Sequence, residues 1–160
     1  MITNLLQWLH DLSISTLVRE SFTIFPILEC IHIYSMILLI TLVATFDLRL
    51  IGFNLARRPM PLARFAKLVV PWAWVCLIIN FLTGSLLFMS KAPDYYVNPA
   101  FRLKMLLILI GVVYHSILLP LALKADDAQP TSIGIKFAGG FSLSLWIGVI
   151  ASSRVIAFTR

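Results

Sequence analysis

Charged residues are scarce in this 160-residue chain. They make up 12% of it, against 60% hydrophobic residues, and the mean hydropathy is +0.95. A soluble domain of this length is about a quarter charged, so this surface carries too little charge to face water and is expected to face lipid. The length allows one membrane domain over residues 1–160 and leaves no room for a separate soluble catalytic module.

Several catalytic and metal-binding motifs are also missing. The chain has two cysteines, Cys30 and Cys76, without a CxxC or CxxCH pattern, which excludes a covalent c-type haem and a zinc ribbon. It has no nucleophile elbow, P-loop, dinucleotide-binding glycine pattern or HExxH helix. The net charge is +6, but no basic stripe is interleaved with aromatics, which disfavours nucleic-acid binding. An electron-transfer or accessory subunit is therefore favoured over a self-contained enzyme.

What the chain has in abundance is apolar segments. Four of them are close to the ~20 residues that cross a bilayer as a helix, at about 22–46, 68–90, 105–123 and 133–158. These segments lack the alternation of apolar and polar residues that is typical of barrel strands. Helices are therefore the structure that can satisfy their backbone hydrogen bonds in lipid. The sequence predicts an all-α integral membrane four-helix bundle. Residues 1–20 do not resemble a signal peptide, and their apolar face predicts a helix in the membrane interface.

The basic residues between the segments predict an orientation. The first connection is the most basic, with Arg49, Arg57, Arg58, Arg64 and Lys67. The second connection carries Lys91, Arg102 and Lys104. Because positive charge accumulates in cytoplasmic loops, the first and third connections are expected in the cytoplasm and both termini outside it.

Ionisable residues within membrane segments usually face a bundle interior, which selects Glu29, His32 and His115. The first and third segments run in the same direction. His32 lies ten residues after Phe22 and His115 twelve after Leu103, so at about 1.5 Å per residue their depths match within roughly 3 Å. Two imidazoles at one depth are what clamping a haem iron from both faces requires.

Other residues suit such a haem slot. Gly111 and Gly84 leave room for a porphyrin edge, Asn80 shares the Gly84 face, and three cations on the outer side are available to propionates: Arg102, Lys104 and Arg154. A further stripe of small residues serves equally well for plain helix packing without a cofactor: Gly140, Ser144, Gly148 and Ser152.

Other interpretations of the ionisable residues stay open. Glu29 is placed to pair with His32 across one turn, either as a structural hydrogen bond or as a proton-relay carboxylate. His32 and Met36 are one turn apart, and an imidazole with a thioether suits Cu(I). Asp47 and Arg49, two residues apart, are expected to contact other helix ends or lipid headgroups where the first segment leaves the membrane.

Several motifs together resemble an uncharacterised family of small bacterial four-helix membrane proteins. They are Pro26-x-x-Glu29-x-x-His32, Asp47-Leu-Arg49-Leu-x-Gly52, Pro71-Trp72, Thr83-Gly84-x-x-x-Phe88 and Asn98-Pro-x-Phe101-Arg-x-Lys104. More distantly, the chain is similar to CopD-like and cytochrome b-like membrane domains. The resemblance implies a multi-pass protein of the bacterial inner membrane, with Glu29, His32, Asp47, Arg49, Lys104 and His115 in a shared pattern.

The leading hypothesis from sequence is a b-type cytochrome subunit that holds haem b between His32 and His115. It would transfer electrons within the membrane, to or from quinone or a partner redox protein. One rival is a cofactor-free accessory or scaffold subunit of a larger complex, or a homo-oligomer. The other is a copper-handling membrane protein that uses His32 and Met36.

Overall fold

The computed structural model describes residues 2–53, 60–123, 133–156 and 158, and this part of the chain contains helices without any strand. In chain order the helices are α1 (Ile2–Asp11), α2 (Ser13–Glu20), α3 (Ile24–Ile51), α4 (Leu62–Ser90), α5 (Ala92–Val97), α6 (Pro99–Leu123) and α7 (Ile133–Ile156).

The four long helices confirm the predicted multi-pass membrane bundle, because α3, α4, α6 and α7 are each long and apolar enough to cross a membrane. Three of them extend beyond the predicted segments at one end, whereas α7 ends at Ile156, inside the predicted 133–158. α3 continues to Ile51, where Gly52 ends it at a φ of 100°, a left-handed conformation that glycine adopts without strain. α6 begins at Pro99 because the Asn98 side chain accepts hydrogen bonds from the backbone N–H groups of Ala100 and Phe101.

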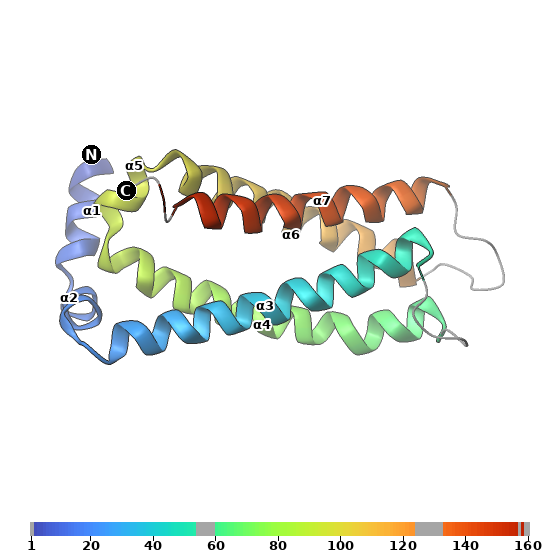
Figure 1. Cartoon of the computed structure of the whole chain (residues 1–160), viewed down its shortest axis with the longest axis horizontal. Helices are drawn as coiled ribbons and strands as arrows, with labels where there is room; N and C mark the ends of the chain where they lie inside the picture. Colours follow the sequence, from blue (N-terminus) through green and yellow to red (C-terminus); the bar gives the residue numbers. More distant parts are fainter. Residues whose placement is uncertain (1, 54–59, 124–132, 157, 159–160) are drawn as a thin grey trace.

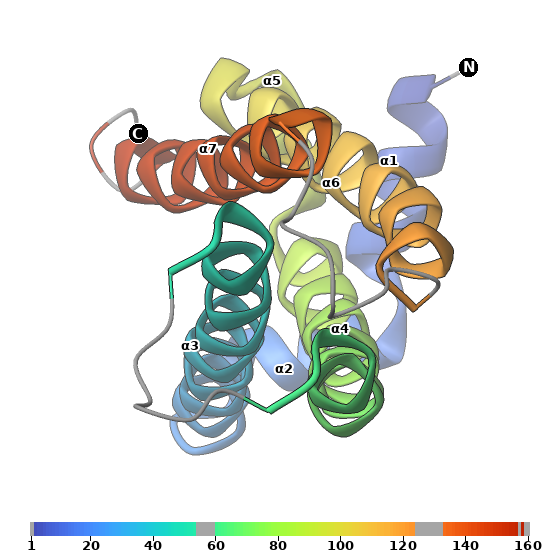
Figure 2. The ribbon, with the colours of Figure 1, turned by 90° about the vertical axis from the view of Figure 1, so that its right-hand side faces the viewer.

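The long helices alternate in direction, and the three short helices gather at one end of the bundle (Figure 1). α3 packs most closely on α4, α6 packs on α7, and α3 also packs on α7. Viewed along the bundle, the parallel helices α3 and α6 occupy opposite corners (Figure 2). The predicted interfacial segment forms two helices, α1 and α2, which lie across the end where α7 also finishes (Figure 1).

Leucine, valine, alanine and aromatic side chains form the packed interior, while many other large apolar side chains point outward. Phe46 and Ala66 are fully buried between α3 and α4, whereas Phe81 is 68% and Tyr34 69% exposed on the outside. In water such a surface would be very unfavourable, so its natural solvent is lipid.

The closest approach between α3 and α7 occurs at Gly139. A Cβ atom there would lie 2.9 Å from the backbone oxygen of Asp47 and 2.9 Å from Cβ of Leu50, whereas one at Gly140 would meet nothing within 4 Å. The predicted small-residue stripe is therefore offset from the real contact, because Gly139 rather than Gly140 faces α3.

We predict that Gly139→Ala lowers the free energy of unfolding by about 1–3 kcal/mol, because the added methyl group meets rigid backbone. Gly140→Ala is the matched control and should leave stability unchanged or slightly higher, since alanine favours helix. Thermal unfolding of both variants in detergent measures the difference. Equal stability of the two variants would contradict the packing described for Gly139.

Candidate functional site

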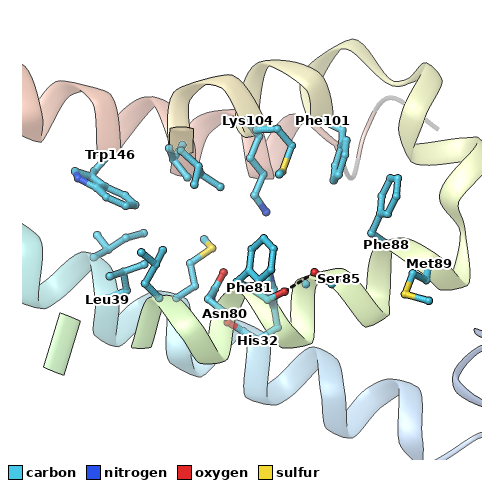
Figure 3. Close-up of a pocket in the computed structure, with 17 residues that line it drawn as sticks. His32, Leu39, Asn80, Phe81, Ser85, Phe88, Met89, Phe101, Lys104 and Trp146 are labelled. Carbon is cyan, nitrogen blue, oxygen red and sulfur yellow. Dashed lines mark hydrogen bonds between the residues drawn. The ribbon is translucent and has the colours of Figure 1, made fainter. Parts of the chain in front are cut away.

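A cavity of about 270 Å³ lies inside the bundle, toward the end covered by α1, α2 and α5. All four long helices contribute to it, and Figure 3 shows its polar residues facing one another across an otherwise apolar space. Its principal lining residues are His32, Met36, Asn80, Phe81, Gly84, Phe88, Phe101, Lys104, Met105 and Trp146.

The imidazole ring of His32 packs against α4 at Gly84. A Cβ atom at Gly84 would lie 2.9 Å from Cε1 of the imidazole, so only glycine leaves room for the ring. Nδ1 of His32 is 3.0 Å from the hydroxyl of Thr83, which donates its own proton to the carbonyl of Ile79 at 2.8 Å. Nδ1 therefore carries the proton and Nε2 keeps its lone pair.

Asn80 ties α4 to α3 beside this histidine. Its amide nitrogen donates to the backbone carbonyl of His32 and to the hydroxyl of Ser35, both at 2.9 Å. The two bonds hold the segment of α3 that presents His32. Such interhelical hydrogen bonds are a main source of specificity where hydrophobic burial does not distinguish protein from lipid.

Lys104 extends from α6 into the cavity toward His32 and Asn80 (Figure 3). The cavity lining includes no aspartate or glutamate, and no described residue forms an ion pair with Lys104. The cavity thus combines one uncompensated cation, one imidazole and apolar walls.

The cavity collects only part of the residues predicted for a site. His32, Gly84 and Lys104 line it, together with Met36 and Asn80. The other polar candidates Glu29, Arg102 and Arg154 are exposed on the outside of their helices, and Gly111 packs against the indole of Trp146.

His115 does not share the level of His32. Its ring packs against Phe46, with centroids 5.2 Å apart, and Phe46 is fourteen residues beyond His32 on α3. At about 1.5 Å per residue, the two histidines are separated by roughly 20 Å along the bundle. The expected match in depth is wrong, because α6 begins at Pro99 and His115 therefore lies far along it. A single haem held by both histidines does not fit this arrangement.

Asp47 is the residue that sequence reasoning misplaced most. The sequence places it where the first segment leaves the membrane, in contact with another helix end or lipid headgroups, but α3 continues past it and its side chain is fully buried. Together with His115 and Ser142 it forms a second polar cluster, at the other end of the bundle from the cavity. A signal was present in the sequence: Gly52, a typical helix terminator, lies more than one turn after Asp47.

Comparison with known proteins identifies one family. A family of unknown function (DUF6644) matches residues 18–159. The chain belongs to this family. No curated protein and no solved structure matches the chain, and the comparisons give no support to a similarity with CopD-like or cytochrome b-like domains.

We predict that Asn80→Ala lowers the free energy of unfolding by about 1 kcal/mol, since interhelical hydrogen bonds in membranes average roughly 0.6 kcal/mol each and two are lost. Ser85→Ala is the control, because the Ser85 hydroxyl also lines the cavity but bonds within its own helix, to the carbonyl of Phe81. Equilibrium unfolding in detergent compares them. If the two variants lose the same stability, Asn80 does not join α3 to α4.

Proposed function

We propose that this membrane protein binds an anionic amphiphile, whose head group reaches Lys104 while its apolar part lies among the aromatic and aliphatic cavity walls. The observation that carries this proposal is the uncompensated ammonium group of Lys104 in a lining without any carboxylate. A cation held away from water is stabilised by an opposite charge, so a carboxylate or phosphate is the complementary head group.

The route into the cavity supports a ligand from the bilayer. The lining includes Phe81 from α4 and Met105 from α6, which are 68% and 45% exposed on the lipid-facing surface. α4 and α6 also pack on each other much less than α3 packs on α4. The cavity therefore opens sideways between these two helices, where an amphiphile already in the membrane can enter.

The size of the cavity limits the ligand. At about 270 Å³ it is near the lower end of small-molecule pockets, which are about 300–1,000 Å³. It accommodates a head group and the first part of a chain, while the remaining chain stays in the bilayer. His32 and Asn80 border the same space, and the free lone pair of His32 Nε2 can accept a hydrogen bond from a protonated or hydroxylated head group.

Trp146 offers a direct probe of binding. It is one of the cavity residues and is 5% exposed, whereas Trp8, Trp72 and Trp74 are exposed to lipid. A variant with the other three tryptophans replaced by phenylalanine reports on the cavity alone. Brominated fatty acid, brominated lysophosphatidic acid and a brominated long-chain alcohol then compare a carboxylate, a phosphate and an uncharged head group as quenchers.

We predict saturable quenching of Trp146 by the carboxylate or the phosphate, and at least about tenfold weaker apparent affinity in Lys104→Met, because a buried charge pair is lost. Arg102→Gln is the matched control, since it removes a cation from the same helix but from its exposed face. Quenching by the alcohol that equals quenching by the acids, or no effect of Lys104→Met, would overturn head-group recognition.

A second candidate function follows from the cavity's soft donors. The thioethers of Met36 and Met105 line the same space as the imidazole of His32, and such ligands favour Cu(I). No group of three His, Cys, Asp or Glu side chains gathers as metal ligands within the described residues, so the methionines would have to complete the site.

If copper is the ligand, purified protein should retain Cu(I) in competition with a chromogenic chelator, and Met36→Leu should release it while Met60→Leu does not. Met60 is the control because it lies outside the cavity. The visible spectrum of oxidised and dithionite-reduced protein tests haem in the same preparation: a Soret band would restore a haem function, with His32 as the one histidine in the cavity. If the purified protein has neither stoichiometric copper nor a Soret band, both the copper and the haem hypotheses are excluded.

A further inference from the structure

A second group of ionisable side chains is buried far from the cavity, between α3, α6 and α7. The side chain of Asp47 is fully buried, Ser142 is 1% exposed and His115 is 8% exposed. The group lies toward the end of the bundle opposite to α1 and α2, since Asp47 is in the last turns of α3. It shares none of its three members with the cavity lining.

The polar atoms of this group are incompletely satisfied. Neither carboxyl oxygen of Asp47 has a well-formed hydrogen bond, although Ser142 faces the carboxyl group from α7. The Ser142 hydroxyl lies 3.5 Å from Nδ1 of His115, and Nε2 of His115 has no partner. Buried polar atoms are nearly always paired, so the unpaired atoms of Asp47 on α3 and His115 on α6 indicate a bound species.

Within the described part of the chain, the charged and titratable groups that neighbour the carboxyl group have other contacts or are exposed. On its own helix, Arg49 donates to the carbonyl of Met60 and lies over the Phe65 ring, 5.7 Å from its centroid. On α7, Lys136 is exposed, and on α6 the Tyr114 hydroxyl donates to the carbonyl of Ala138 at 3.2 Å.

The face that α4 presents here is apolar. Its buried side chains are Leu62, Ala66 and Val70, while its cations Arg64 and Lys67 are exposed. Among the described residues, the carboxyl group of Asp47 therefore lies in an apolar interior, with His115 as the base of its cluster.

An ionised carboxylate without a partner in such an interior costs several kcal/mol, and membrane-embedded carboxylates of this kind are usually functional. A proton is the simplest species that removes this cost. If Asp47 and His115 together hold one proton, the cluster is neutral whether the proton resides on the carboxyl group or on the imidazole. A divalent metal is a poorer fit, because the described residues supply no third carboxylate, thiolate or imidazole ligand here.

We propose that Asp47, Ser142 and His115 form an intramembrane proton-binding site. The carboxyl group and the imidazole are the two positions of the proton, and the Ser142 hydroxyl between them can accept from one and donate to the other. A small cavity of about 30 Å³ beside the site is lined by His115 and Trp146, whose ring nitrogens Nε2 and Nε1 both lack partners. It has room for a water molecule that bonds to both nitrogens.

The test locates the proton spectroscopically in protein reconstituted into lipid at neutral pH. The remaining described acids, Asp11, Glu20, Glu29 and Asp94, are exposed on the outside of their helices, so the Asp47→Asn variant is needed to assign any carboxyl band to Asp47. A protonated-carboxyl C=O band in the infrared spectrum that disappears in Asp47→Asn places the proton on Asp47. If the band is absent, ¹⁵N NMR of histidine-labelled protein should show His115 as an imidazolium, identified by loss of its signal in His115→Gln.

Two controls separate the site from a structural role. Asp94→Asn removes an exposed carboxyl group and should leave both spectra unchanged. Ser142→Ala should shift the Asp47 band to higher frequency, because the carboxyl group loses its hydroxyl neighbour. An ionised Asp47 together with a neutral His115 at neutral pH would overturn the proposal, and so would a spectrum that changes when K⁺ is replaced by Na⁺, which would indicate a metal cation instead.

Discussion

In hydrocarbon a polar side chain finds no solvent to bond with, and the arrangement of this bundle follows from that constraint. The amide of Asn80 reaches across to α3, and the hydroxyl of Thr83 accepts from His32. Hydroxyls without a partner on another helix bond to their own helix, as Ser144 does with the carbonyl of Gly140. Apolar side chains gain little by leaving lipid for the interior, so the polar contacts and the small residues between helices select how the helices pair.

The interior separates its polar groups into two levels. Leu39 and Val43 of α3 pack with Trp146 and Val149 of α7 between them and form an apolar layer. Lys104 and His32 lie on one side of that layer, and Asp47 lies on the other. Each level contains a buried or partly buried ionisable group, Lys104 in one and Asp47 in the other. Trp146 lines both the large cavity and the small one, as Leu39 and Leu77 do, so these side chains separate the two levels.

The two levels differ in how much room lies between the helices. Where Gly139 meets α3 the backbones approach closely, and the cavity beside His115 measures only about 30 Å³. Toward the other end, Gly84 has no side chain, which leaves room for the ring of His32. The bulky residues Phe88 and Phe101 stack at the margin of the cavity, with ring centroids 5.3 Å apart. A ligand of some size therefore suits the open level, and a proton or a water molecule suits the closed one.

The sequence by itself determined the lipid environment and the number of long apolar helices, because composition and helical spacing report these directly. It proposed His32, Lys104, Asn80, Gly84 and Met36 for a haem or copper site, and the structure shows that they line one cavity. The sequence did not determine how deep each side chain lies along the bundle relative to the neighbouring helices. A shift of six residues in the start of the third segment moves His115 by about 9 Å, and which residue lies opposite it depends on how the helices slide along one another. Only the tertiary structure placed His115 beside Phe46 and buried Asp47, because the register between helices depends on close contacts such as the one at Gly139.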